Sequence, residues 1–391
     1  MPQPPVVDFE AHNAEVREVW AAYHAARPLR VPFTLGLNVR YTMRRPEANP
    51  SGIGWREYFA DAPTMARRQC EHQHWIRHWL NHDHEMGLPA QWSLSVDWQN
   101  CYEALYLGCQ LEFRGTEVPD TQPLLADEDA KYQLFDRGLP DPFAAPAAAR
   151  AWALWGALGE LADAGWEFEG RPVARPWPMG LGTDGPLTVA CNLRGASEFC
   201  TDLLADPDYA QQLLTYITSA TIERIQAYRA RLDQPVRSAG WGLADDSVAL
   251  LSAEQYRAHI LPHHHRLVEA LREPGGPLHV HLCGDAVRHF PTFITELGAV
   301  SFDTGYPIDH AAVRAQLGPE IELLGGPSVP FLATHGPAEV EAECARILTS
   351  GVTAGGRFVL REGNNLPAEC PPENVWAMAR AVRRWGRYDP A

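Results

Sequence analysis

With 391 residues, 46% of them hydrophobic and 10% aromatic, the chain can bury a large core, which excludes extensive disorder. Asp and Glu number 49 against 33 Lys and Arg, and the resulting net charge of −16 argues against nucleic acids and anionic membrane surfaces as partners. The N-terminus has no basic and apolar leader pattern, and no apolar run reaches about 18 residues, so we expect a cytoplasmic protein.

Strand-like and helix-like segments alternate along the chain, which favours a parallel sheet. Short β-branched or aromatic runs predict eight strands, at Val31–Asn38, Trp92–Trp98, Leu187–Arg194, Ala239–Ala244, Leu278–Cys283, Val300–Asp303, Ile321–Gly325 and Arg357–Arg361. Amphipathic stretches predict helices over Met65–Asn81, Ala144–Ala164, Asp208–Leu232, Ala253–Arg272, Asp285–Glu296, Pro337–Leu348 and Glu373–Trp385. Eight strands with intervening helices are typical of a single (β/α)8 TIM barrel, an α/β fold.

Two segments fall outside this alternation. Residues 1–30 are expected to form an N-terminal helical extension, so that the barrel spans residues 31–391. The segment Tyr106–Phe143, after the second strand, combines the strand-like run Gly108–Phe113 with turn-rich sequence at Leu139–Pro142. We expect this segment to be an insertion that lies over the mouth of the barrel.

Polar residues follow nearly every predicted strand. In a parallel barrel the active site forms where the strands give way to their βα loops, so these residues are site candidates. Any one of them alone is more simply explained as a cap or a surface turn. The candidates for catalysis are Asp97, Asp245, Asp246 and Asp303, and those for substrate binding are Asn38, Arg40, Tyr41, Asn192 and Asn364.

The sharpest local pattern is the segment Leu278–Gly284, which reads LHVHLCG. His281 and Cys283 are two residues apart on a predicted strand, so their side chains point to the same face. Imidazole and thiolate are ligands that zinc prefers, and a catalytic zinc usually takes three protein ligands. The alternative is a buried structural histidine beside an inert cysteine.

Two other histidine groups are interpreted as structural. His74, His78 and His82 recur every four residues, a step that drifts around a helix and cannot close on one ion. The run from His263 to His265 follows Pro262 at a helix, and its three side chains point in different directions.

The segment His281–Gly284 resembles the His-x-Cys-Gly element of the uroporphyrinogen decarboxylase superfamily, in particular of its zinc-dependent methylcobamide:thiol methyltransferase branch. Phe302–Asp303 and Gly325–Pro327 are similar to further elements of the superfamily. The tail, Gly363–Pro367 with Pro372–Val375, resembles its closing signature. The resemblance implies a barrel enzyme that acts on a small molecule.

Similar segments occur upstream. Gly242–Asp246 and Leu251–Tyr256 resemble the mid-barrel part of the superfamily, and Ser95–Asp97 looks like the segment that carries the catalytic aspartate of the decarboxylases. The decarboxylases also carry arginines after the first strand for a substrate with many carboxylates. The stretch Leu37–Tyr41 keeps at most one of them, so a porphyrinogen is poorly matched.

The leading hypothesis is zinc-dependent methyl transfer to or from a thiol or a corrinoid carrier. Methyltransferase members have a third zinc-binding cysteine in the tail and decarboxylases a histidine, whereas this chain has Asn364. Zinc at His281 and Cys283 would therefore take its third ligand from Asp245, Asp246 or Cys370. Because the chain has no Asp-x-His-x-x-Gly corrinoid-binding motif, a corrinoid would arrive on a partner carrier protein.

Two alternatives remain open at this point. The first is a metal-independent decarboxylase or related lyase, in which Asp97 holds the donor groups of an electron-rich ring while carbon dioxide leaves. The second is a non-catalytic barrel that binds a small ligand. Near-stoichiometric zinc in the protein would favour the methyltransferase hypothesis and its absence the lyase, whereas tight ligand binding without turnover would favour the non-catalytic barrel.

Overall fold

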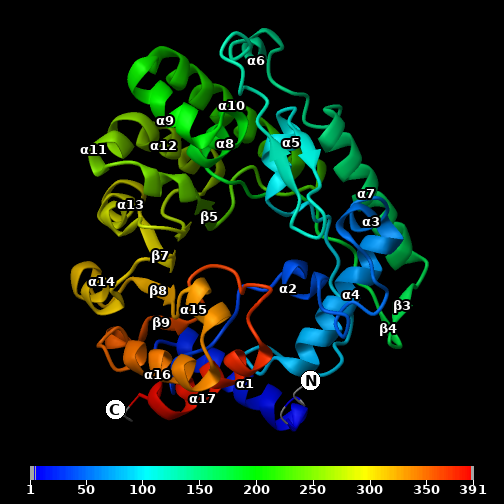
Figure 1. Cartoon of the computed structure of the whole chain (residues 1–391), viewed down its shortest axis with the longest axis vertical. Helices are drawn as coiled ribbons and strands as arrows, with labels where there is room; N and C mark the ends of the chain where they lie inside the picture. The colour runs from blue at the N-terminus through cyan, green and yellow to red at the C-terminus, as the bar shows by residue number, and fades with distance from the viewer. Residues whose placement is uncertain (1–3, 5, 389–391) are drawn as a thin grey trace.

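A five-stranded parallel sheet forms the centre of the fold, in the order β5-β6-β7-β8-β9 (Figure 1). The computed structural model describes residue 4 and residues 6–388. Strands that are consecutive in the chain are neighbours in the sheet, as in repeated βα units. The strands are β5 (Trp241–Ala244), β6 (Leu278–Leu282), β7 (Ala299–Thr304), β8 (Glu322–Gly325) and β9 (Phe358–Leu360).

Isolated parallel bridges continue this sheet at both of its edges. The segment around Phe33, predicted as the first strand, lies beside β9, and the segment ending at Asp184 lies beside β5. The predicted second strand, Trp92–Trp98, is extended but forms only single bridges. The bridges of these segments join Phe33 to Leu360, Asp184 to Ala244, Trp92 to Val173, and Ser95 to Trp177.

Helices surround the sheet and make up most of the rest of the chain (Figure 1). The first half contains α1 (Phe9–His24), α2 (Val39–Met43), α3 (Trp55–Tyr58), α4 (Ala62–Trp79), α5 (Tyr102–Tyr106), α6 (Gln133–Asp136) and α7 (Pro146–Asp163). They are followed by α8 (Pro186–Arg194), α9 (Ala196–Ala205), α10 (Pro207–Arg231), α11 (Ala253–Gln255), α12 (Leu261–Leu271), α13 (Phe290–Leu297), α14 (His310–Leu317), α15 (Val329–Thr334), α16 (Pro337–Leu348) and α17 (Pro372–Trp385).

Two short antiparallel hairpins lie outside the central sheet. One is formed by β1 (Gln110–Glu112) and β2 (Asp120–Gln122), inside the segment predicted as an insertion. The other is formed by β3 (Glu167–Phe168) and β4 (Arg171–Pro172). In the part of the chain that the structure describes, no helix is both long enough and apolar enough to cross a lipid bilayer.

The prediction of a third strand at Leu187–Arg194 is wrong, because this segment forms most of α8. Its apolar and β-branched residues, such as Val189, suggested a strand. Pro186 occupies the first turn and Gly195 the C-cap, two positions that favour the beginning and the end of a helix. The strand position beside β5 belongs instead to the segment that ends at Asp184.

The N-terminus of α8 is held by a carboxylate. Asp245 accepts hydrogen bonds from the backbone N–H groups of Leu187 (3.2 Å) and Thr188 (2.7 Å), two donors that have no partner inside the helix. Asn192 therefore lies on a helix and not at the end of a strand, which corrects the reason for proposing it as a substrate ligand.

Candidate metal and substrate site

The carboxyl ends of β6 and β7 bring two predicted site residues together. In β6, Leu278, Val280 and Leu282 are buried, so the alternation of the strand turns His281 to the opposite face. The register of the two strands pairs His281 with Asp303 of β7. As a result, Nδ1 of His281 lies 2.7 Å from Oδ2 of Asp303.

The other ring nitrogen of His281 faces a thiol and a second carboxylate. Its Nε2 lies 3.1 Å from Sγ of Cys283 and 3.8 Å from Oδ1 of Asp246. The same oxygen of Asp246 accepts a hydrogen bond of 2.7 Å from the backbone N–H of Cys283. One nitrogen, one sulfur and one oxygen thus lie within 4.8 Å of one another, from residues that all remain partly exposed.

This donor set fits a zinc ion. Imidazole, thiolate and carboxylate are the three ligand types of protein zinc sites, and bond lengths of 2.0–2.3 Å place the ligand atoms of a tetrahedral ion roughly 3.4–3.6 Å apart. The distances from Nε2 to Sγ and Oδ1, 3.1 and 3.8 Å, fall on either side of this spacing. Asp303 bonds the far nitrogen of the ring, as carboxylates commonly do behind metal-bound histidines.

Local charges perturb the titration of this group in the metal-free chain. Burial acts to lower the pKa of His281, but hydrogen bonds to Asp303 and Cys283 outweigh it and raise the pKa to about 11. Burial raises the pKa of the Cys283 thiol, and the adjacent His281 opposes that shift. The imidazole is therefore protonated at neutral pH without a metal, and a metal would displace its Nε2 proton.

Asp245 and Cys370, the other candidates for a third ligand, lie elsewhere. Asp245 is fully buried; besides the α8 backbone it binds the hydroxyl of Thr188 at 2.7 Å and Nε2 of His264 at 2.8 Å. Cys370 is also buried, with its sulfur 3.6 Å from the carbonyl of Pro371. Within the described part of the chain, neither residue joins the donor set.

Asp97 accepts three hydrogen bonds from its own neighbours. Its carboxylate accepts hydrogen bonds from the hydroxyl of Tyr58 (2.7 Å), the backbone N–H of Gln99 (2.8 Å) and the side-chain amide of Gln99 (2.6 Å). Burial raises the pKa of Asp97, against the opposing effect of these hydrogen bonds. Gln99 in turn accepts from Nε of Arg40 at 2.5 Å, so Asp97 fixes the residue that holds this guanidinium.

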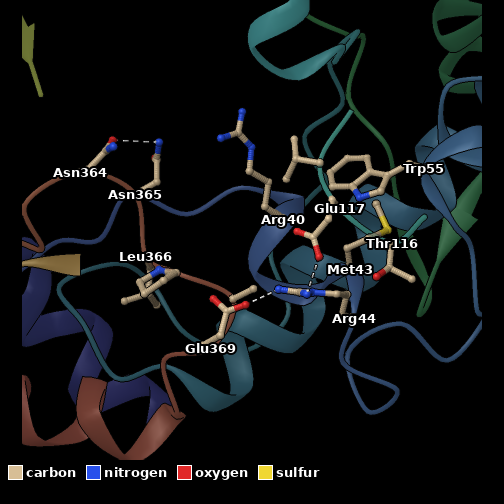
Figure 2. A pocket seen from close by; sticks show the side chains of 13 residues that line it. Arg40, Met43, Arg44, Trp55, Thr116, Glu117, Asn364, Asn365, Leu366 and Glu369 are labelled. Atoms are coloured by element: carbon tan, nitrogen blue, oxygen red, sulfur yellow. Dashed lines mark hydrogen bonds and ion pairs between the residues drawn. The ribbon is translucent and has the colours of Figure 1, made fainter. Parts of the chain in front are cut away.

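A cavity of about 270 Å³ lies between α2, the segment Tyr106–Phe143 and the tail (Figure 2). Two predicted substrate residues, Arg40 and Asn364, line it. Arg44 links the other two walls, because its guanidinium pairs with Glu117 of that segment at 3.2 Å and with Glu369 of the tail. The lining is Arg40, Met43, Arg44, Trp55, residues 116–118 and residues 364–369.

Three other predicted substrate residues do not line this cavity. Tyr41 is buried, and its hydroxyl donates to the carbonyl of Cys370 at 3.0 Å. Asn38 is the N-cap of α2, where its side chain accepts from the backbone N–H of Arg40 at 2.9 Å. Asn192 is half-buried on α8. Tyr41 and Asn38 therefore hold α2 in place, Tyr41 against the tail and Asn38 as its N-cap, and do not contact the cavity.

Sequence reasoning missed three charged residues at this end of the sheet. Arg361 follows β9 and binds Asp303 at 2.6 Å. It is the last residue of the predicted strand Arg357–Arg361, so taking polar residues at strand ends as candidates, as for the other strands, would have found it. Next to it, Glu362 is fully buried, and burial raises its pKa to about 7. Asp184 was missed because the third strand was predicted at Leu187–Arg194, whereas the segment beside β5 ends at Asp184. Burial, with neighbouring Glu103, raises the pKa of Asp184 to about 8.

A parallel sheet with polar side chains gathered at the carboxyl ends of its strands is characteristic of enzymes that bind small molecules. The family profile described as uroporphyrinogen decarboxylase (URO-D) matches residues 171–385, and the chain belongs to this family. The resemblance of the His281–Gly284 segment and of the tail to this superfamily is thus confirmed.

Known proteins related to the chain include both enzyme types of the superfamily. A uroporphyrinogen decarboxylase of Pelobacter propionicus is 28% identical over 210 residues, 52% of this chain and 58% of that protein. A methylated-thiol–coenzyme M methyltransferase of Methanosarcina mazei is 29% identical over 294 residues, 73% of this chain and 71% of that protein. The chain thus spans little more than half the length of the decarboxylase.

A solved structure of a methyltransferase from Methanosarcina mazei has the same fold. It superposes with a TM-score of 0.62 over 94% of this chain and 98% of its own, at 17% sequence identity. At this identity the likeness concerns the fold alone.

Proposed function

We propose that this protein is a zinc-dependent methyltransferase of the URO-D family that acts on a thiol. The observation that carries the proposal is the donor set of Asp246, His281 and Cys283, which offers three zinc ligands of the preferred types and leaves a fourth position for a substrate atom. The thiol methyltransferase relative, aligned over 73% of the chain, supports the same assignment.

The proposal includes closure of the sheet into a (β/α)8 barrel. The bridge of Phe33 to β9 and the bridge of Asp184 to β5 support a ring of parallel segments with its mouth at the donor set. In that arrangement the cavity beside Arg40 opens at the mouth, next to the tail that begins at Asn364.

In the proposed reaction, Asp246, His281 and Cys283 would hold the zinc. When bound, zinc would lower the pKa of a thiol substrate, so that the sulfur is a thiolate at neutral pH and able to take a methyl group. Asp303 keeps the His281 ring in place through Nδ1, so that Nε2 points into the donor set.

Arg40 and Asn364 would bind the remainder of the substrate. The Arg40 guanidinium is held by the amide oxygens of Gln99 (2.5 Å) and Asn100 (2.8 Å), and no described carboxylate forms an ion pair with it. Its positive charge is therefore not neutralised by a direct partner. We propose that the methyl donor is a corrinoid delivered by a partner carrier protein.

A metal-independent decarboxylase is the second candidate, supported by the decarboxylase of Pelobacter propionicus among the relatives. In this hypothesis Asp97 would accept hydrogen bonds from the substrate ring. Three hydrogen bonds from Tyr58 and Gln99 already occupy its carboxylate, which favours the methyltransferase over the lyase.

Zinc content distinguishes the two candidates, and the two cysteines offer a matched pair of variants. We expect wild-type protein, purified without a tag, to bind about one zinc per chain, Cys283→Ser to lose it, and Cys370→Ser to keep it. Wild-type protein that binds no zinc when supplied with it, or Cys283→Ser protein that still binds zinc in full, would overturn the proposal.

A further inference from the structure

Asp303 lies between His281 and an arginine that the proposed reaction does not use. The same carboxylate oxygen, Oδ2, lies 2.7 Å from Nδ1 of His281 and accepts a hydrogen bond of 2.6 Å from Nη1 of Arg361. Both Asp303 and Arg361 are mostly shielded from solvent, with side chains 17% and 13% exposed. The other oxygen of Asp303, Oδ1, is buried and has no hydrogen-bond partner among the described residues.

The orientation of this carboxylate therefore depends on Arg361. Both contacts converge on Oδ2 and Oδ1 has no partner, so rotation of the carboxylate about the Cβ–Cγ bond is opposed by hydrogen bonds only at Oδ2, and Arg361 supplies one of the two. The guanidinium donates from a planar, rigid fork and fixes the direction of the acceptor oxygen better than a flexible donor would.

The remaining contacts of Arg361 extend toward the cavity. Nη2 donates to the backbone carbonyl of Asn364 at 2.6 Å and to Glu362 at 3.3 Å. The buried Glu362 in turn accepts from the backbone N–H of Gly36 at 2.6 Å. A Cβ on Gly36 would lie 2.3 Å from the guanidinium, so the segment from the first predicted strand packs directly against it.

We infer that Arg361 is a positioning residue that acts through Asp303 to hold the His281 imidazole in its metal-binding orientation. The same guanidinium holds the carbonyl of Asn364, so it also sets the position of the cavity wall relative to the donor set. This inference rests on the proposed function, since it assigns Arg361 a role toward a metal at that donor set.

Zinc affinity tests the inference without an activity assay. Loss of a residue behind a metal ligand typically lowers metal affinity by about 10- to 100-fold, and we expect about 10-fold weaker zinc binding for Arg361→Gln in competition with a chromogenic chelator. Arg361→Lys, which keeps the charge and one donor to Asp303, should recover part of the loss. Arg380→Gln, which removes an exposed arginine paired with Glu341, serves as the control and should bind zinc like the wild type.

A double-substitution cycle separates positioning from general destabilisation. If Arg361 acts through Asp303, Arg361→Gln should change zinc affinity little once Asp303→Asn is present, whereas a general loss of stability would add to it. Absorption spectra of the cobalt-loaded proteins report the geometry of the nitrogen and sulfur ligands independently. We expect Arg361→Gln to alter the visible bands and Arg380→Gln to leave them unchanged.

The outcomes distinguish this inference from the proposed function. Wild-type protein that binds neither zinc nor cobalt would overturn both. Wild-type protein that binds zinc through Cys283, with equal affinity and an unchanged cobalt spectrum in Arg361→Gln, would overturn the role of Arg361 and leave the proposed function standing. Additive losses in the double substitution would also overturn it, because they would show that Arg361 does not act through Asp303.

Discussion

Asp246 and His281 approach each other to 3.8 Å across the ends of two neighbouring strands, whereas Asp245, one residue earlier, faces the opposite way into the core. Asp246 therefore belongs to the donor set, whereas the adjacent Asp245 is part of the packed core. The two carboxylates differ in function although they are adjacent in the chain.

Conservative substitution of the two aspartates is expected to affect different properties, zinc binding for Asp246 and the free energy of unfolding for Asp245. Asp246→Asn should lose zinc while changing the free energy of unfolding by less than about 1 kcal/mol, since its side chain is 43% exposed. Asp245→Asn should cost about 2–3 kcal/mol, because a buried carboxylate that binds α8 and His264 loses an acceptor. Zinc analysis and urea unfolding of both variants provide the test; equal destabilisation by the two would contradict it.

Gly305 allows the loop after β7 to approach the Cys283 backbone. A Cβ at this position would lie 2.6 Å from the Cys283 Cα and 2.6 Å from the Gly284 nitrogen. Gly305→Ala should therefore displace Cys283, weaken zinc binding and destabilise the fold by about 1–3 kcal/mol. Gly242→Ala is the control, because a Cβ there meets no atom within 4 Å. Equal thermal stability and zinc affinity in the two variants would show that the close approach has no cost.

Stability is expected to decrease in mild acid. Burial lowers the pKa of His72 to about 3 and of His263, His289 and His310 to about 4, from an ordinary value of 6.5. The unfolded chain binds these protons first, so the stability that these four histidines contribute is complete above pH 6.5 and is lost as the pH falls toward 4. Each histidine contributes up to about 1.4 kcal/mol per pH unit in that range. Asp184 and Glu362, whose pKa values are raised to about 8 and about 7, take up protons on folding and act in the opposite direction, but they are two groups against four.

Urea unfolding at pH 7.5, 6 and 5 measures this dependence. His289→Gln, which can keep the hydrogen bond to the Val248 carbonyl, should reduce the slope of stability against pH by about one proton. The matched control is His24→Gln, at an exposed position, and it should leave the slope unchanged. Identical slopes for His289→Gln and the wild type would be evidence against the prediction.

Arg44 is expected to hold the loop at Glu117 against the tail at Glu369. Its partners Glu117 and Glu369 are exposed, so Arg44→Gln should change global stability by less than about 1 kcal/mol. Local opening should increase, because both ion pairs across the cavity are lost together. Amide hydrogen exchange should become faster at residues 114–119 and 366–370, and unchanged for Arg175→Gln, which removes an exposed pair with Asp163. Unaltered exchange in both segments would refute a holding role.

Regular patterns made much of the fold predictable from the sequence. The alternation of buried leucine and valine with His279 and His281 gave both the existence of β6 and the face on which His281 lies. Proline at the helix start and a polar or glycine cap gave α16 its bounds, Pro337–Leu348, as predicted. The prediction of the third strand failed because α8 is short and apolar, and because Asp245, which accepts hydrogen bonds from its first turn, is distant in the chain.

The candidate site was predictable only in part, for a related reason. A strand end identifies which residues are near the site, but not whether a neighbour already occupies the side chain. Asp245, Tyr41 and Cys370 are near in the chain or the fold, yet a helix N-terminus or a packed core engages each of them. Arg361 shows the converse, because its contact with Asp303 becomes apparent only when β7 and β9 are placed in the same sheet, on either side of β8.

The sheet is regular from β5 to β9, whereas the segments at its edges form only isolated bridges. This difference affects how relatives of the protein can diverge. His281 lies on β6, and Asp246 and Cys283 follow the ladder-bonded strands β5 and β6 within two residues, all inside the part of the chain that matches the family profile. The cavity walls at Arg40 and residues 116–118 come instead from the short helix α2 and a hairpin loop outside the central sheet. Insertions and exchanges in the first 170 residues can reshape the cavity without moving the donors. We therefore expect family members with the same donor set to accept different substrates, and chimaeras that exchange this part of the chain to transfer substrate preference while retaining metal affinity.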